Sequence, residues 1–324
     1  MLAQRRKVVI GDEEFRTPML VPSFSSKGFP EVRKTIQTMS EHITDEVLVS
    51  SYDLYYKFIK QGKHIHFPTM VFLDSGGYEA GIGLDFVDLY KENYDPNDWK
   101  VDFHKEVLSK WDFNIPTAVI SYDNPNRRSS TQVQINRAKA LFKKYPEGAK
   151  EFLIKATAEN GPYINIDEII DCRYQFSDFD VLGLTDKELG PSLLVRMKNI
   201  AKLRRSLDEI GLDIPIHIFG SLDPISSPLY FLAGADIFDG LTWLRYAYYD
   251  GMAVYKENYC ASQISIARKD VIMEGMIWIA NYSYLQDLQM EMKRFLLENS
   301  FDVFTHNKLL FQTSYEALLE EIGE

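Results

Sequence analysis

The stretch MVFLDSGGYEA, residues 70–80, shows the pattern from which the fold can be worked out. An apolar, β-rich run ends at Asp74, two glycines follow at Gly76 and Gly77, and an aromatic ring comes at Tyr78. Near-continuous apolar runs of this length are typical of parallel strands that are covered on both faces. The question is whether the residues after the run form only a turn or part of a site.

Seven further runs of the same kind occur along the chain, and helix-like stretches at 30–42, 130–145 and 191–211 alternate with them. The runs are PMLVPSF (18–24), EVLVSS (46–51), TAVISYD (117–123), FLIKAT (152–157), DVLGLT (180–185), PIHIFG (215–220) and DIFDGLT (236–242). Eight such units predict an α/β fold, a (β/α)8 TIM barrel, with a doubly wound open sheet as the alternative. Helical patterns at 275–299 and 313–323 predict a C-terminal extension from about residue 250. We interpret residues 1–324 as a single barrel domain.

Composition and charge narrow the possible functions. The 324 residues are 45% hydrophobic and carry a net charge of −11, so binding to nucleic acid would require a local basic patch. No apolar run approaches the ~18 residues of a membrane span, and the first residues lack a signal-peptide pattern. Cys172 and Cys260 lie far apart, which predicts no disulfide framework and a cytoplasmic location.

Three carboxylates are expected at the carboxyl ends of strands. Asp74 follows the third run, Asp123 ends the fourth and Asp239 lies near the end of the eighth. Each alone could be a helix cap or a turn residue. Because the chemistry of (β/α)8 barrels takes place at this end, three together predict a site for acid/base or glycosyl chemistry.

Other polar clusters were weighed as sites and given ordinary interpretations. The HIH triplet (64–66) precedes the third strand, at the end of the barrel away from the chemistry, and His217 is expected in the core or behind the site. No phosphate loop, serine nucleophile elbow or zinc ligand set is found. Three basic pairs are interpreted as solvated faces: Arg127–Arg128, Arg204–Arg205 and Arg268–Lys269.

The segment DSGGYEA (74–80) resembles the DSGG-aromatic motif of the tRNA-guanine transglycosylase family. Other segments resemble family motifs in the same order, over about residues 17–295. They are TPMLVPS (17–23), SYDNP (121–125), VLGLTDKELG (181–190), FGSLDP (219–224), GADIFDGLTWLRYAYYDG (234–251) and IANYSYLQDLQMEMKRF (279–295).

The resemblance implies two catalytic residues. Asp239 corresponds to the nucleophile that attacks the ribose anomeric carbon and forms a covalent glycosyl-enzyme. Asp74 corresponds to the general acid/base that protonates the departing guanine and takes a proton from the incoming base. Two displacements at one carboxylate resemble retaining glycoside chemistry.

The resemblance also implies a set of base-binding residues. Tyr78 would stack on the base, Asp123 would accept hydrogen bonds from its amide and amine edge, and the backbone of Gly183 would meet it. Arg245 matches an arginine six residues after the nucleophile. Ser75 and Gly220 lie in the matched motifs and complete the substrate-binding set.

The chain also departs from the family pattern. Only Cys260 remains where the family has a three-cysteine zinc motif, Lys155 and Ala156 stand in place of Gln-Gly, and Pro125 replaces a cysteine. The charged segment TDKEL (185–189) occupies the pocket loop. The departures predict no zinc or other cofactor and a divergent branch. The candidates are the DNA 7-deazaguanine transglycosylases and the transglycosylase-like accessory proteins of CBASS-type antiviral operons.

The expected function is therefore exchange of guanine for a 7-deazaguanine in a nucleic acid, tRNA or DNA, by a homodimer with no membrane association. Two alternatives stay open. One is a 7-deazaguanine-binding module acting on a non-tRNA partner, such as a nucleobase–protein conjugate or a nucleotide. The other, from outside the family, is a barrel glycosidase.

Overall fold

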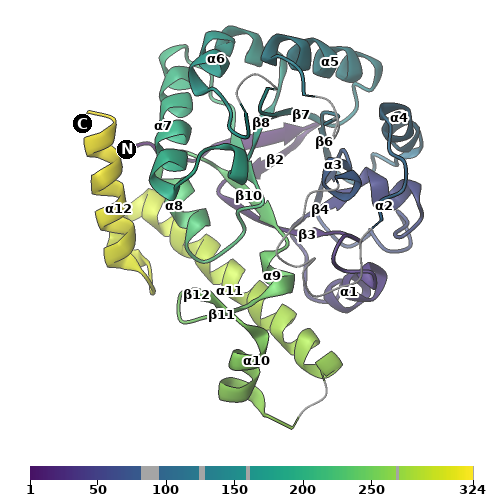
Figure 1. Ribbon diagram of the computed structural model, residues 1–324, viewed down its shortest axis with the longest axis vertical. Helices are drawn as coiled ribbons and strands as arrows, with labels where there is room; N and C mark the ends of the chain where they lie inside the picture. Colours follow the sequence, from purple (N-terminus) through teal and green to yellow (C-terminus); the bar gives the residue numbers. More distant parts are fainter. Residues whose placement is uncertain (82–94, 124–127, 158–160, 268–269, 324) are drawn as a thin grey trace.

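A closed barrel of eight parallel strands forms the centre of the protein in the computed structural model (Figure 1). The structure describes residues 1–81, 95–123, 128–157, 161–267 and 270–323. The strands are β3 (Met19–Phe24), β4 (Glu46–Ser50), β5 (Met70–Asp74), β6 (Thr117–Ile120), β7 (Ala149–Ile154), β8 (Val181–Thr185), β9 (Ile216–Phe219) and β10 (Ile237–Gly240). They follow one another in chain order, and β10 pairs with β3 to close the barrel. The (β/α)8 prediction is confirmed.

Most strand boundaries fall within one or two residues of the predicted runs. The exceptions are β6 and β7, which both end three residues before their runs do. In β7 the pairing begins earlier, because Ala149 is in register with Ala118 of β6. Asp123 therefore lies in the loop beyond its strand, three residues after Ile120, and not at the strand end itself.

Helices surround the barrel and bury the outward-facing residues of the strands. The helices between strands are α1 (Val32–Met39), α2 (Ser51–Tyr55), α3 (Gly77–Ala80), α4 (Val101–Lys110), α5 (Thr131–Lys144), α6 (Ile166–Asp171), α7 (Leu193–Glu209) and α8 (Ser226–Leu232). Helix α7 begins with Ser192 accepting a hydrogen bond from the Val195 backbone, and the chain turns at Gly211 with φ +70°. Both features agree with the predicted helix ends.

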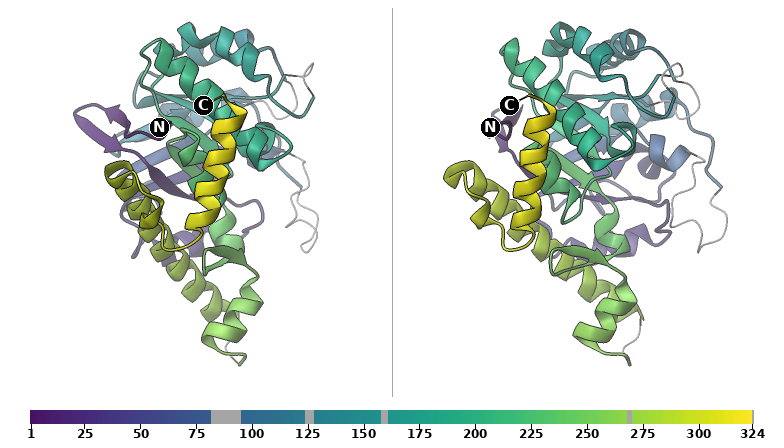
Figure 2. Two further views of the ribbon diagram at one scale, coloured as in Figure 1. Left: turned by 90° about the vertical axis from the view of Figure 1, so that its left-hand side faces the viewer. Right: turned by 60° about the vertical axis from the view of Figure 1, so that its left-hand side comes forward.

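The C-terminal helices complete the barrel wall and extend beyond it. After α9 (Thr242–Arg245), the hairpin of β11 (Ala247–Tyr249) and β12 (Met252–Val254) leads to α10 (Lys256–Tyr259). Helix α11 (Asp270–Glu298) then packs against β3 and α1, in the place of the eighth barrel helix, and α12 (Lys308–Glu321) packs against α7 and α8. The part around α10 projects away from the barrel (Figures 1 and 2). Exposed apolar side chains occur on α11 and α12, and the homodimer remains a prediction.

The amino-terminal end of the barrel is covered by a hairpin of β1 (Lys7–Ile10) and β2 (Glu13–Arg16). Val8 and Phe15 belong to the same apolar cluster as Met19, Met70 and Val181, the first residues of their strands. The opposite end, where the carboxyl ends of the strands lie, is the one that carries the predicted site.

A buried ion-pair network lies beside this hairpin. Arg6, almost fully buried, pairs with Asp236 at 3.1 Å and with Asp213 at 2.9 Å. Arg204 is fully buried, pairs with Asp208 at 2.9 Å and donates to two backbone carbonyl groups. The prediction of a solvated face was wrong for Arg204, because this position of α7 faces the barrel. Arg127, Arg268 and Lys269 lie outside the described residues.

Candidate active site

The turn after β5 brings two acidic segments together. Gly76 has a φ of +89°, and a Cβ atom there would lie 2.9 Å from the Trp99 ring. A Cβ atom at Gly77 would lie 2.9 Å from a carboxylate oxygen of Asp123. Gly76 is thus favoured by its positive φ and by the closeness of the Trp99 ring, and Gly77 by the closeness of the Asp123 carboxylate. Asp74 lies directly before this turn, so the two carboxylates line the same mouth of the barrel.

Asp239 is held from three sides on the inner face of β10. Its Oδ2 accepts a hydrogen bond from the Ser23 hydroxyl at 2.7 Å. Its Oδ1 accepts from the Gly220 backbone N–H at 3.3 Å and lies 3.3 Å from Nε2 of His217. The side chain is 7% exposed. The two hydrogen bonds and the nearby imidazole together fix the orientation of the carboxylate.

His217 connects Asp239 to a second buried carboxylate. Its Nδ1 lies 2.7 Å from an oxygen of Glu151, and both residues are fully buried. Burial by itself would lower the pKa of His217, but the negative charges of Glu151 and Asp239 outweigh it and raise that pKa to about 9. The ring of Phe219 stacks on the imidazole with centroids 4.1 Å apart. The imidazole is therefore positively charged at neutral pH and supports a negative charge on Asp239.

Asp74 has surroundings that favour the protonated acid. Its Oδ2 accepts a hydrogen bond from the Gly76 backbone N–H at 2.9 Å. Burial raises the pKa of Asp74 to about 7, and the nearby charges of Glu79 and Asp239 act in the same direction. No described cation lies within ion-pair distance of this carboxyl group. Asp74 can therefore both give and take a proton near neutral pH.

Two further carboxyl groups lie behind Asp74. Glu79 on α3 accepts hydrogen bonds from the hydroxyls of Ser25 at 2.5 Å and Ser50 at 2.7 Å. Burial and the charge of Asp53 raise the pKa of Glu79 to about 7. Asp53 accepts from the backbone and the hydroxyl of Ser26, and burial raises the pKa of Asp53 to about 6. The described hydrogen-bond donors to both carboxyl groups are neutral.

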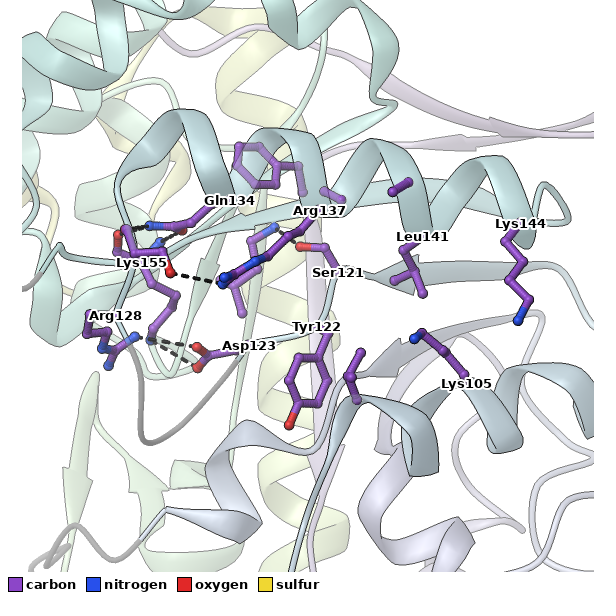
Figure 3. A pocket seen from close by; sticks show the side chains of 16 residues that line it. Lys105, Ser121, Tyr122, Asp123, Arg128, Gln134, Arg137, Leu141, Lys144 and Lys155 are labelled. Carbon is purple, nitrogen blue, oxygen red and sulfur yellow. Dashed lines mark hydrogen bonds and ion pairs between the residues drawn. The ribbon is translucent and has the colours of Figure 1, made fainter.

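Asp123 lies among charged side chains at the rim of the barrel (Figure 3). Its backbone N–H donates to the Ser75 hydroxyl at 3.2 Å, which ties the loop to the end of β5. Lys155 and Arg128 lie 3.9 and 3.5 Å from its carboxylate. Burial raises the pKa of Asp123, and the two cations oppose that shift. Both cations also pair with Glu188, at 2.6 and 3.0 Å.

Tyr78 projects from α3 and is 38% exposed. The Lys27 ammonium lies 4.6 Å from its ring centroid, and Arg245 donates to its hydroxyl at 2.7 Å. The predicted aromatic and the predicted arginine are thus in contact, although 167 positions separate them. Stacking of Tyr78 on a base stays a prediction.

Gly183 lies in the middle of β8, in register with Leu153 and His217 on the neighbouring strands. A Cβ atom at this position would lie 2.7 Å from the Phe219 ring and 3.1 Å from a Glu151 oxygen. The missing side chain thus leaves space for the buried Glu151–His217 pair. The predicted contact between this backbone and a base is not tested by the arrangement.

Several residues of the mouth carry little sign of their role in the sequence. Glu79 lies within a motif, Lys155 departs from one, and Glu151 belongs to none of the quoted motifs. His217 was expected in the core or behind the site, where it lies. The alternation of side chains along β7 could have indicated Glu151 as well, because it shares a face with inward-pointing neighbours. The deviation at Lys155 was itself a signal, since its ammonium now pairs with Glu188.

In the part of the chain that the structure describes, no group of three or more His, Cys, Asp or Glu side chains could hold a metal ion. No helix in that part is both long and apolar enough to cross a membrane. His64 is buried before β5 and accepts from the Lys60 backbone at 2.9 Å. Cys260 packs in an apolar cluster with Ala247 and Ile277.

Fold and site together define a (β/α)8 barrel with an acidic, partly protonated mouth. A comparison with models of known protein families found no match, and a comparison with curated proteins found none either.

Proposed function

We propose that this chain is a base-exchange transglycosylase, which replaces guanine in a nucleic acid with a 7-deazaguanine. The observation that carries the proposal is the contrast between Asp239 and Asp74 in one barrel mouth. Asp239 has two hydrogen-bond donors and a cationic imidazole next to its carboxylate, whereas burial keeps the pKa of Asp74 near 7. A nucleophile and an acid/base held in different protonation states are what retaining glycosyl transfer needs.

The reaction follows from these two carboxyl groups. An oxygen of Asp239 attacks the anomeric carbon, the bond from this carbon to the guanine nitrogen breaks, and protonated Asp74 gives its proton to the departing base. In the second half, ionised Asp74 takes the proton from the ring nitrogen of the incoming base. That nitrogen attacks the same carbon, and the bond to Asp239 breaks. Asp74 ends protonated, as it began, so protons balance over the cycle.

Recognition of the base rests on Asp123 and Tyr78. A purine held by stacking and by a carboxylate on its edge must lie outside its helical stack, as nucleobase-modifying enzymes require. The close approach of the Asp123 carboxylate to Gly77, next to the partly exposed ring of Tyr78, supports this arrangement. The motif order noted in the sequence supports it further.

A second candidate is the 7-deazaguanine-binding module with a non-tRNA partner. It is favoured by the pairing of Asp123 and Glu188 with Lys155 and Arg128, because these ion pairs occupy groups that would otherwise face the base. In this case a base would bind without exchange.

Incorporation of labelled guanine into tRNA, single-stranded DNA and duplex DNA tests the proposal and separates the candidates. We expect incorporation into one of these polymers. Asp123→Ala should raise KM for the base at least about tenfold and leave kcat closer to that of the unaltered protein. Binding of a 7-deazaguanine without incorporation into any polymer would favour the second candidate and overturn the first.

A further inference from the structure

A groove of about 520 Å³ runs between α4 and α5 on the outside of the barrel and begins at Asp123. We call it the α4–α5 groove. Its lining includes the cations Lys105, Arg128, Arg137, Lys144 and Lys155. The single carboxylate among its described lining residues is Asp123. This is a concentration of positive charge on a chain whose net charge is −11.

The cations are spaced along the groove by the geometry of α5. Arg137 and Lys144 are seven residues apart, so they lie on the same face of the helix and about 10 Å apart along its axis. Lys105 approaches from α4, on the opposite side (Figure 3). Between them Leu141 and Phe152 form part of an apolar floor. The groove therefore offers positive charge on its walls and an apolar surface below.

Two of the five cations, Arg137 and Lys144, have no carboxylate partner among the described residues, whereas Arg128 and Lys155 pair with Asp123 and Glu188. Arg137 donates to the Ser129 hydroxyl at 2.9 Å, and the Lys144 ammonium lies over the Tyr145 ring at 5.4 Å. Within the described residues, neither cation has a carboxylate within 4.0 Å. Lys105 pairs only with the exposed Asp102, at 3.0 Å. Exposed pairs of this kind are weak, so a stronger anion can displace Asp102.

We propose that the α4–α5 groove binds the phosphate groups of a nucleotide. An arginine and two lysines on facing walls match a phosphate chemically, and the apolar floor can pack a sugar or a base. The volume lies in the range of small-ligand sites. The inference rests on the proposed function in one respect, namely that Asp123, where the groove begins, binds the base. The nucleotide is therefore either the neighbour of the exchanged base in a strand or a free nucleotide.

Binding can be measured by fluorescence anisotropy with a labelled single strand of about ten nucleotides, within the usual range of single-strand sites. Guanosine monophosphate serves as competitor. Arg137→Gln/Lys144→Gln removes two groove cations. Lys139→Gln/Lys143→Gln is the matched control, because it makes the same charge change on the same helix at positions outside the groove lining.

We expect the groove variant to bind at least about tenfold more weakly and the control to bind like the unaltered protein. Each lost phosphate contact should also reduce the slope of log K against log salt by about 0.7, so by about 1.4 in all. Strand binding that the mononucleotide does not displace at millimolar concentration assigns the site to a strand. Tight competition by the mononucleotide assigns it to a free nucleotide.

Equal binding by the groove variant and the unaltered protein would overturn the inference, and so would equal losses in variant and control. Absence of binding by both probes would do the same. A melting temperature for the groove variant near that of the control shows that both are folded. Because binding is measured without base exchange, a protein that binds the strand in the groove but never exchanges a base would refute the proposed function alone.

Discussion

The two ends of the barrel handle buried charge in opposite ways. At the amino-terminal end, Arg6 and Arg204 neutralise Asp236 and two neighbouring aspartates, with direct ion pairs of 2.9–3.4 Å. At the carboxyl-terminal end, Asp53, Asp74 and Glu79 have only neutral donors among their described hydrogen-bond partners. Burial raises the pKa of Asp236 as well, but its two arginines oppose that shift. Asp53, Asp74 and Glu79 have no such partner, and burial raises their pKa values to about 6 or 7, although Asp239 and Asp123 at the same end do lie beside cations.

This difference fits a structural role for one end and supports the chemical role proposed for the other. A buried carboxylate with a cationic partner stays charged, so it can stabilise a fold but cannot readily exchange a proton. A buried carboxyl group without such a partner has a raised pKa and can exchange protons near neutral pH. The same location of chemistry at the carboxyl ends of the strands holds for (β/α)8 barrels in general.

Removing a cation from the neutralised end should have the largest effect on stability. Arg6→Met leaves the buried Asp236 with only Arg204, at 4.0 Å. We expect the free energy of unfolding to fall by about 3–5 kcal/mol, measured by urea denaturation. Arg5→Met, at the exposed neighbouring position, is the control and should change stability by less than about 0.5 kcal/mol. Similar losses in both variants would contradict the account of this network.

At the other end, neutralising a carboxyl group should leave stability intact and remove activity. Asp74→Asn keeps the shape of the side chain but cannot donate or accept the proton. We expect base exchange to fall by about 100-fold or more, and stability at pH 8 to be unchanged or higher. Asp287→Asn, at an exposed position of α11, makes the same substitution away from the mouth and is the control. Loss of stability at pH 8 in Asp74→Asn alone would refute the view that this acid is kept without a charged partner.

The pH dependence of stability gives a finer test of the same contrast. Glu79 and Asp74 have a folded-state pKa of about 7, above the values near 4 of unfolded chains. Between these values the folded state holds more protons, so stability should fall as pH rises from about 4 to about 7. Glu79→Gln removes one of these groups. The variant should therefore gain on the order of 2 kcal/mol relative to the unaltered protein between pH 5 and pH 8.

Melting curves at the two pH values measure this gain. Gln132→Glu is the control. Its stability relative to the unaltered protein should not change with pH in this way, because an exposed carboxyl group keeps nearly the same pKa on unfolding. A constant difference between Glu79→Gln and the unaltered protein across the range would show that Glu79 is ionised throughout.

The barrel could be predicted from the sequence because each of its strands is an apolar run long enough to be recognised alone. The carboxylates at Asp74 and Asp239 were found for the same reason, since they end or nearly end such runs. Whether a residue ends a strand can be read from the local sequence. Because all eight strands are parallel, their carboxyl ends lie at the same end of the barrel, so residues at these ends are close in space.

The supporting residues could not be found in this way. Glu79 acts on Asp74 only because α3 folds back over the strand ends, and Lys155 reaches Glu188 from a different strand. Arg204 was expected at the surface because an arginine pair on a helix is usually solvated, and the acidic partners that allow its burial lie up to 32 positions away. Pairings of this kind are set by tertiary packing and leave little trace in a single sequence.

The most direct test of the central claim is covalent capture of a nucleic acid on Asp239. The unaltered protein, incubated with its substrate polymer and without an incoming base, should give an adduct that survives a denaturing gel. Asp239→Asn keeps the shape of the side chain and removes the nucleophile, so the adduct should disappear and exchange should fall on the order of 10³-fold or more. Full exchange or an undiminished adduct in Asp239→Asn, with a verified substrate, would contradict the mechanism.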